Sequence, residues 1–403
     1  MRLKPPLILH RFHLRENATG SRSGERHVVK SGVGRGNGAK MNSQKFAWWK
    51  ILLILIIVVL LLVGGYAAYV FLTYSRIEDN VDLTVEGNVQ ELAQTGKEYT
   101  AVSYNIGFGA YTADFTFFMD GGKESRARSK DSVLECVNGT AQTALSFEPD
   151  IVLFQEVDTD STRSWHVDQK EIIRSAFGEK GNWDSVFAPN YHSAYLMYPL
   201  NKPHGKSNSG ILTLSRMDIT SSLRRSLPIA TNFKKILDLD RCYNYSRIPV
   251  ENGKELVVFN THLSAYGTDA SQGNSQLQML FEDMQREYAA GNYVLCAGDF
   301  NHDFTRDSIE YFNPGSEESF SWCAPFPDEI MPDGFIKCAD YAEGMVPSTR
   351  NTDIPYCEDS FVVILDGFIV SDNIEPTYVQ NIDEGFQYTD HNPVVLKFIL
   401  KDN

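Results

Sequence analysis

Residues 48–74 form the most constraining feature of the sequence, an apolar run that contains a single charge, Lys50. The run is long enough to cross the roughly 30 Å hydrocarbon layer of a membrane as one helix. A buried helix of a soluble protein rarely extends this far without a polar face. A cleaved signal peptide normally has a shorter apolar region that ends at a small-residue cleavage site, for which only Gly64–Ala68 is a weak candidate. The run therefore predicts a transmembrane signal anchor.

The charges on the two sides of this run predict its orientation. Eleven Lys and Arg precede residue 51, whereas Glu78, Asp79 and Asp82 follow the run closely. The positive-inside rule then predicts a single-pass protein of the cell membrane, with its N-terminus in the cytoplasm and the remainder outside. Residues 1–47 are basic and lack periodicity, so we expect a disordered cytoplasmic segment. Met41 is an alternative start, because the residues after it already supply a basic flank.

The chain beyond the apolar run is strongly acidic. Residues 74–403 carry 26 Lys and Arg against 50 Asp and Glu, a formal net charge of −24. A field of this sign repels polyanions unless a local basic patch overrides it. Long nucleic acid is therefore disfavoured as the main substrate, although it is not excluded.

All six cysteines follow the apolar run, on the side of the membrane where disulfides are permitted. Cys323, Cys338 and Cys357 fall in one segment, and a bridge between two of them would staple it. A zinc site is not indicated, because the sequence has no C-x-x-C and no neighbouring histidine pair.

Residues 98–403 alternate strand-like and helix-like segments, which predicts one catalytic α/β domain after a linker at residues 75–97. The strand-like segments are Tyr99–Ile106, Asp150–Val157, Ser209–Ser215, Leu256–Leu263, Tyr293–Phe300, Phe361–Ser371 and Pro393–Leu400. Lys130–Phe147 and Ser275–Ala289 have helical spacing of apolar residues. The strands are continuously apolar, so we expect them to be buried on both faces. Residues 302–360 lack periodicity and are predicted to be a long loop.

Polar residues of catalytic type lie at or near the ends of six of these strands. They are Asn105, Glu156, His262, Asp299, Asn301, Asp366, Asp390 and His391. Ligands of open α/β sheets collect at strand ends, and Asp299 and Asn301 are spaced to point the same way along a strand. Each feature alone is weak, since a lone Asp-His pair lies more often on a surface. The complete set in this order predicts a catalytic site.

Six motifs carry a resemblance to a known superfamily. SYNI, QEV, NTHL, GDFN, LDGFIVS and DHNP occur in this order, and over roughly residues 98–400 the chain resembles the endonuclease/exonuclease/phosphatase superfamily. That superfamily includes deoxyribonucleases, abasic-site endonucleases, inositol polyphosphate phosphatases and neutral sphingomyelinases. The resemblance implies an α/β fold of two packed mixed β-sheets flanked by helices, a four-layer sandwich preceded here by one transmembrane helix. The chain departs from many members at Gly367, where they have an aromatic residue, and in the longer loop 302–360.

The resemblance also implies a metal site. Phosphoester hydrolysis needs a cation to neutralise phosphoryl oxygens, an oriented water and a proton for the leaving oxygen. Glu156 is implied as the main metal ligand, with Asn105 beside it and Asp390 as a contributor. Oxygen ligands of this kind suit Mg²⁺, with Mn²⁺ or Ca²⁺ as alternatives.

The catalytic roles implied by the resemblance fall on five residues. Asp299 would orient or deprotonate the attacking water, and Asn301 would hold that water or a phosphate oxygen. His391, with Asp366 fixing its tautomer, would act as general base or phosphate stabiliser. His262 would bind the phosphate or assist the leaving group, as a histidine with a pKa near neutrality can.

The segment 187–210 precedes a strand and is expected to border the site. In relatives this region contacts the substrate phosphate, so Tyr191, His192, His204 and Lys206 are candidate substrate-binding residues. A solvated loop is the alternative interpretation. The aromatic residues of 302–360 could likewise form a lipid-facing or base-stacking surface, or simply pack the loop on itself.

Three functions remain compatible with the sequence. The first is a membrane-anchored, metal-dependent phosphodiesterase or phosphatase that hydrolyses a lipid headgroup or small phosphorylated metabolite by in-line attack of water. The acidic domain and the tether favour it over the second, an extracellular nuclease. The third is a surface binding module that keeps the fold without the activity.

Overall fold

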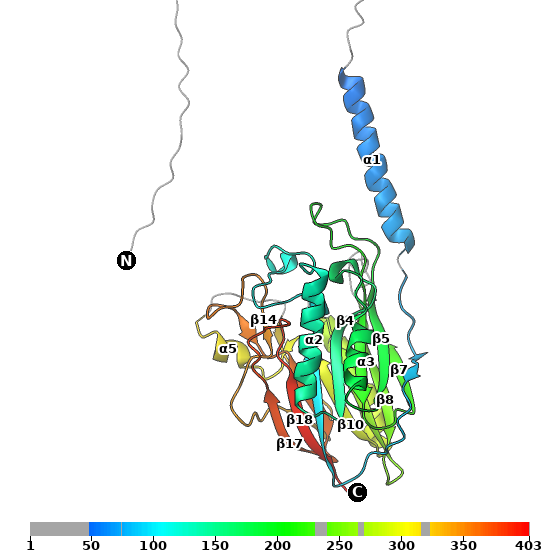
Figure 1. The fold of residues 1–403 in the computed structure, drawn as a ribbon, viewed down its shortest axis with the longest axis vertical. Helices are drawn as coiled ribbons and strands as arrows, with labels where there is room; N and C mark the ends of the chain where they lie inside the picture. Colours follow the sequence, from blue (N-terminus) through cyan, green and yellow to red (C-terminus); the bar gives the residue numbers. More distant parts are fainter. Residues whose placement is uncertain (1–47, 74, 230–239, 265–269, 316–322, 403) are drawn as a thin grey trace, which may run out of the picture. The chain divides into compact units, whose positions relative to one another are not determined.

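The computed structural model describes residues 48–402 apart from 74, 230–239, 265–269 and 316–322. Its first element is helix α1 (Trp48–Thr73), which buries no residue (Figure 1). The mean hydropathy of its most apolar window is 3.0, so length and composition would allow it to cross a membrane. A signal sequence would meet the same two criteria, so anchorage remains a prediction.

Two seven-stranded mixed sheets form the body of the domain. The first sheet has the order β1 (Val81–Asp82), β7 (Ser221–Ser226), β8 (Cys242–Pro249), β9 (Glu255–His262), β10 (Tyr293–Asp299), β16 (Asp366–Ser371) and β13 (Phe335–Cys338). The second has the order β17 (Ile374–Asn381), β18 (Val394–Leu400), β3 (Glu98–Asn105), β4 (Ile151–Asp158), β6 (Asn208–Ser215), β5 (Asp184–His192) and β2 (Val85–Glu86). Two-stranded pairs β11 (His302–Asp303) with β12 (Ala324–Pro325) and β14 (Thr349–Arg350) with β15 (Val362–Val363) lie outside them.

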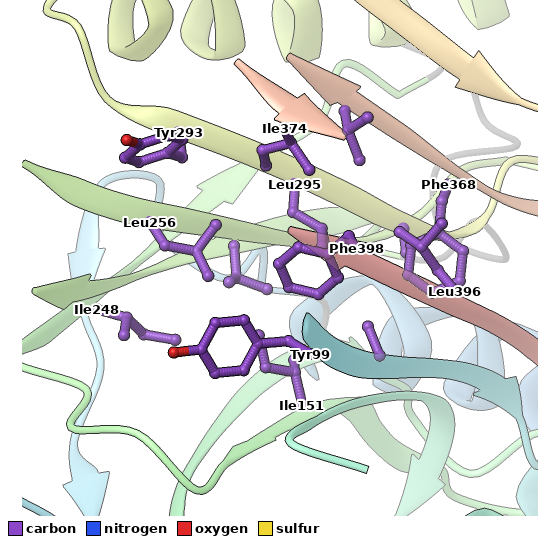
Figure 2. Packing of buried hydrophobic residues seen from close by; sticks show 14 of the residues in the cluster. Tyr99, Ile151, Ile248, Leu256, Tyr293, Leu295, Phe368, Ile374, Leu396 and Phe398 are labelled. Carbon is purple, nitrogen blue, oxygen red and sulfur yellow. The ribbon is translucent and has the colours of Figure 1, made fainter. Parts of the chain in front are cut away.

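The two sheets pack face to face over one apolar layer. Tyr99 of the second sheet and Leu295 of the first belong to the same buried cluster, and Figure 2 shows both among the side chains that fill it. Successive strand residues point to opposite faces, so Val102 and Val294 instead face helices on the outside of each sheet. The predicted burial of the strands on both faces follows from this arrangement.

Helices cover the outer faces. Helix α2 (Lys130–Ser146) begins after the Ser129 side chain, which accepts a hydrogen bond from the Ser132 amide, and α3 (Gln169–Gly178) begins in the same way at Asp168. Both pack on the second sheet, while α4 (Ala270–Ala289) packs on the first. The predicted four-layer α/β sandwich is confirmed.

The segment 302–360 is more ordered than its composition predicts. It contains β11, β12, β13 and β14, together with helix α5 (Ser308–Phe312) and the 3₁₀ helix Asp328–Ile330. β13 pairs with β16 and so extends the first sheet, which makes the prediction of a plain loop wrong. The periodicity was hidden because β13 is only four residues long and alternates around one lysine.

Two further sequence predictions differ from the structure. The predicted strand Phe361–Ser371 is divided into β15 and β16, because the carbonyls of Ile364 and Leu365 accept hydrogen bonds from the amides of Phe304 and Phe300 instead of a ladder partner. All six cysteines are free, so the suggested bridge in the segment Cys323–Cys357 is not formed. The segment 75–97 contributes β1 and β2 to the sheets.

Candidate functional site

The site lies where strands of the two sheets end together. β9 and β10 are parallel neighbours, and their register places His262 beside Asp299. β16 runs antiparallel to β10 and begins opposite Asp299 with Asp366. In the second sheet, parallel β3 and β4 bring Asn105 alongside Gln155, next to Glu156. Strand direction and register therefore collect residues separated by more than 250 positions.

Local backbone irregularities turn the site side chains out of the regular ladders. Glu156 has φ of 57° and falls where the pairing of β4 with β6 shifts register. Asn301, two residues after β10 ends its run, has φ of 51°. Gly298 has φ of 148°, and a Cβ there would lie 1.9 Å from the Thr261 carbonyl oxygen. Only glycine therefore permits this approach of β9 to β10.

Side-chain hydrogen bonds join the sheets directly beneath the site, and two of them connect side chains of neighbouring strand ends. The Asn105 Nδ2 donates to Asp299 Oδ2 over 3.0 Å. The Gln155 Nε2 donates to Asn260 Oδ1 over 2.9 Å, and all four side chains are buried. Because buried polar groups are costly when unpaired, these bonds fix the relative position of the two sheets at the site.

His391 is held by Asp366. Its Nδ1 lies 2.8 Å from Asp366 Oδ2, which also accepts from the hydroxyls of Ser348 at 2.7 Å and Thr349 at 3.1 Å. The Thr349 hydroxyl is itself 3.0 Å from the same ring nitrogen. Burial alone would lower the pKa of His391, but the carboxylates of Asp366, the largest contributor, Asp390 and Asp299 together outweigh burial and raise that pKa to about 10. The ring is therefore oriented and cationic at neutral pH, with its Nε2 facing Asp299 at 3.8 Å.

Asp299 and His262 form the second proton-carrying pair. His262 Nε2 lies 3.4 Å from Asp299 Oδ2, and the buried His262 Nδ1 has no hydrogen-bond partner among the described residues. Burial lowers the pKa of His262 well below its usual range, so its imidazole is neutral. Burial, followed by the neighbouring Asp366, raises the pKa of Asp299 to about 7. One carboxyl poised near neutrality thus lies between two imidazoles.

Glu156 and Asp390 are two further carboxylates of the site. Asp390 is half-buried, and desolvation, with a contribution from Glu156, raises its pKa to about 6. Glu156 is half-buried and turned out of its strand. Two like charges in one partly dry cavity repel each other unless a cation lies between them.

These residues surround one open cavity of about 230 Å³. Its described lining consists of Phe108, Tyr111, Phe117, Met119, Asp120, Glu156, Arg163, Tyr191, His204, Arg241, His262, Ser264, Asp299, Asn301, Thr349, Arg350, Asn351, Leu365, Asp390 and His391. The lining combines aromatic and apolar side chains with ionisable ones. Such a cavity suits a charged group with an apolar neighbour.

Most sequence-predicted site residues reach this cavity, and two do so indirectly. Asn105 lies behind Asp299, and Asp366 lies behind His391. The remaining motif residues line the wall directly.

The four candidate substrate contacts divide evenly. Tyr191 and His204 line the cavity, and burial lowers the pKa of His204 to about 4, so its ring is neutral. His192 instead bonds to Ser75 through its Nε2 at 3.2 Å, and the exposed Lys206 is absent from the described lining.

Three arginines in the cavity wall had no signal in the sequence motifs. Arg163 is buried, and its Nε and Nη2 bind the two carboxylate oxygens of Asp158 at 3.0 and 2.8 Å. Its guanidinium lies 4.0 Å from the centre of the Phe108 ring. Arg350 donates to the carbonyls of Thr112 and Phe115, while its buried Nε has no partner within the part of the chain that the structure describes. Arg241 is the third. Arg350 lies in the segment expected to be a loop, and Arg163 and Arg241 in stretches without motif spacing.

Two groups of ligands could hold a divalent cation. Glu156, Asp390 and Asn105 offer hard oxygen atoms, the donor set that Mg²⁺ and related ions prefer, and the mutual repulsion of the two carboxylates indicates the same position. Asp299, Asp366 and His391 have ligand atoms within 4.8 Å of one another. Each group also has an oxygen that is already bonded, because Asp366 Oδ2 accepts from His391 and two hydroxyls and Asn105 Oδ1 accepts from the Gly107 amide. The residues present therefore fit a cation in either group.

The chain is similar to several solved structures. A protein from Beutenbergia cavernae, described as an endonuclease/exonuclease/phosphatase, has a similar fold, with a TM-score of 0.53 and 16% identity over 76% of this chain and 72% of its own. An endonuclease/exonuclease/phosphatase family protein from Leptotrichia buccalis gives a TM-score of 0.49 at 14% identity, over 74% and 99%. ANGEL2, described as a 2′,3′-cyclic phosphatase, gives 0.49 at 14%, over 80% and 99%. At these identities the likeness concerns the fold alone.

No curated protein sequence matches the chain significantly. The model of the Endonuclease/Exonuclease/phosphatase family matches residues 102–391, which contain all eight strand-end polar residues from Asn105 to His391. The chain therefore belongs to the endonuclease/exonuclease/phosphatase family of phosphoester hydrolases.

Proposed function

We propose that this protein is a membrane-anchored, divalent-metal-dependent phosphoesterase that hydrolyses a lipid headgroup phosphoester or a small phosphorylated metabolite. The observation that carries the proposal is the composition of the cavity. It is lined by the oxygen ligands Glu156 and Asp390 and by the imidazoles of His391 and His262, and Asp299 lies between these imidazoles. Hydrolysis of a phosphoester needs neutralisation of the phosphoryl oxygens and an oriented water that loses a proton.

The protonation state of each residue determines its role in the proposed reaction. A cation at Glu156, Asp390 and Asn105 would neutralise the phosphoryl oxygens. The cationic His391 ring donates a hydrogen bond from its Nε2 to a phosphoryl oxygen, because its Nδ1 proton is committed to Asp366. Asp299, whose pKa lies near 7, accepts the proton of an attacking water when it is ionised. Asn301, held through its Nδ2 by the Leu263 carbonyl at 2.8 Å, presents its amide oxygen to that water.

The size and charge of the cavity favour a small substrate group. About 230 Å³ accommodates a phosphoryl group and its immediate substituents. The guanidinium groups of Arg163 and Arg350 offset the acidic body near the cavity, which lowers the cost of bringing in an anion. The apolar wall at Phe108 and Phe117 would pack against the alcohol part of the ester.

Activity measurements test the proposal directly. The full chain in detergent, with Mg²⁺, would be assayed on bis-p-nitrophenyl phosphate, phospholipids including sphingomyelin and phosphoinositides, and plasmid DNA. Glu156→Ala and His391→Ala should each lose activity by at least about 100-fold, and EDTA should abolish it. Exposed Glu135→Ala and His166→Ala are matched controls that should retain it.

Each pattern of turnover selects one function. Preferred turnover of phospholipid or small ester supports the proposal, whereas preferred turnover of DNA assigns a nuclease. A folded protein that turns over none of these substrates would instead be a binding module. Metal titration of Glu156→Gln and Asp366→Asn by calorimetry then separates the two candidate cation sites, because only the variant that lost a ligand should lose affinity.

A further inference from the structure

The apolar side chains exposed on the domain gather beside the cavity. Outside α1, ten large hydrophobic residues of the described chain are exposed, and four of them lie within residues 195–200. A fifth, Met119, lines the cavity itself. We name these five residues the rim patch: Met119, Tyr195, Met197, Tyr198 and Leu200. Leu200 is 83% exposed and Tyr198 69%, which is uncommon for residues that are not in contact with another molecule or a membrane.

The loop that carries most of the rim patch is held to the domain by backbone hydrogen bonds and ring contacts. Residues 193–207 connect β5 to β6, and the Leu196 and Gly205 backbones exchange two hydrogen bonds of 3.0 Å across this connection. In Figure 1 it is the green loop that projects past the ends of β4 and β5. The Tyr198 ring lies 5.7 Å from that of Phe118, in the short 3₁₀ helix Phe118–Asp120. The projecting loop and the cavity wall are therefore one packed unit.

Basic groups accompany the apolar ones. Lys202 follows the loop, and its pKa is lowered by burial and then by the nearby positive charge of Arg126. The Ser125 hydroxyl donates to the Lys202 carbonyl, which ties the two basic segments together. These cations stand out on a chain that carries a net charge of −24 after α1. An anionic surface would repel most of the domain and attract this edge, so charge selects which edge turns toward it.

The tether brings this same edge close to the end of α1 along the chain. Only residues 74–80 separate α1 from β1, a reach of roughly 28 Å when fully extended. Within that stretch Ser75 hydrogen-bonds to His192, the last residue of β5, after which the connection bearing the rim patch begins. A short tether that meets the domain here would leave this edge within reach of a bilayer crossed by α1.

We propose that the rim patch and its basic neighbours are a bilayer-docking surface, which inserts into the headgroup region of an anionic membrane and opens the cavity toward lipid. Aromatic and aliphatic side chains flanked by cations are the composition of interfacial segments. The inference rests on the proposed function for its anchor and deepens it by naming the substrate class, an ester presented within the membrane surface.

Depth measurements on the full chain test this surface independently of catalysis. On a Cys357→Ser background, which removes the one exposed cysteine, Leu200→Cys is labelled with an environment-sensitive fluorophore and reconstituted into vesicles with and without anionic phospholipid. Glu251→Cys, in the exposed turn at the opposite end of the strands, is the matched control. Spin-labelled lipid should quench residue 200 about fivefold more than residue 251, more so with anionic lipid, and Lys202→Glu should remove that dependence.

Activity measurements supply the second arm. Tyr198→Ser with Leu200→Ser should reduce turnover of vesicle-embedded phospholipid about tenfold or more and leave turnover of soluble bis-p-nitrophenyl phosphate unchanged. Equal quenching at residues 200 and 251 would overturn the proposal, as would equal losses on both substrates. A blue-shifted but unquenched label would assign the patch to a protein contact and also overturn it. If no substrate is turned over, the proposed function fails, while the quenching comparison still decides the docking surface.

Discussion

Replacing Asp366 with Asn tests the electrostatic basis of the site. Asp366 accepts a hydrogen bond from His391 over 2.8 Å, and it is the carboxylate that raises the His391 pKa most. Asparagine keeps the size of the side chain and removes its charge, while the burial of the ring remains. The pKa of His391 should therefore fall from about 10 to below its ordinary 6.5. A decrease of three to four units corresponds to roughly 4–5 kcal/mol of lost stabilisation of the imidazolium.

The measurement is a nuclear magnetic resonance titration of the His391 ring protons in EDTA, so that no bound cation shifts them. The His391→Ala spectrum assigns the signal. Asp372→Asn is the matched control, because Asp372 is an exposed carboxylate just beyond the opposite end of the same strand. A His391 pKa that stays above 9 without the Asp366 charge would refute the reasoning and transfer the effect to Asp390 or Asp299.

The same substitution has consequences for stability and rate. The His391 pKa is raised on folding, so its contribution to the free energy of unfolding is complete below pH 6.5 and is lost as the pH rises through about 10. Asp366→Asn should remove this dependence, as denaturant titrations at several pH values would detect. At pH 7.5 the imidazolium would be largely lost, and turnover should fall about 10²- to 10⁴-fold.

Three other perturbations follow from the geometry. Gly298→Ala should destabilise the domain by several kcal/mol, on the order of 3, and remove activity, because its Cβ would occupy the position of the Thr261 carbonyl oxygen; thermal unfolding and turnover measure both. Asp158→Asn should cost about 3–5 kcal/mol by leaving the buried Arg163 charge without its carboxylate, as denaturant unfolding would show. Asp299 has its pKa raised to about 7, so the metal-free protein should lose stability as the pH rises from 4 to 7, by up to about 4 kcal/mol, and Asp299→Asn should flatten that slope.

Matched control variants distinguish these specific effects from a non-specific loss of stability that any substitution could cause. Gly253→Ala changes another glycine of positive φ, where a Cβ meets no atom within 4 Å, so it should cost only about 1 kcal/mol. Asp168→Asn keeps a helix-capping side chain and should cost less than Asp158→Asn. Equal costs within either pair would contradict the structural explanation, and an unchanged pH slope in Asp299→Asn would assign it to other groups.

The sequence predicts the centre of the fold well, because the central strands are apolar on both faces. β9 and β10 carry runs such as LVVF and YVLCAG, which stand out against their surroundings. The outer strands lack such apolar runs and cannot be recognised in this way. β7 reads SSLRRS, and its Arg224 is buried because the guanidinium donates to the backbone carbonyls of Glu78, Pro189 and Asp240. Hydropathy cannot anticipate a charge that is satisfied by three distant carbonyls.

The candidate site shows the same division between local and distant signals. The membership of Glu156 and His391 in the site can be predicted from the sequence, because each residue lies next to an apolar strand. Thr349 does not, because its contact with the His391 ring depends on how β14 folds over the site, 42 residues away in sequence. Arg163 is likewise recognisable only once Phe108 and Asp158 lie against it.

The hydrogen bond between Asn105 and Asp299 joins two sheets that each supply only part of the active site. Neither sheet alone therefore carries a complete set of catalytic residues. Partial opening along that seam separates Asn105 and Glu156 of the second sheet from His262 and Asp299 of the first before either sheet melts. Loss of activity on heating should therefore coincide with, or slightly precede, the loss of tertiary signal and never follow it. Turnover consequently measures whether both sheets are folded together. We expect no partly unfolded state that keeps one sheet and remains active.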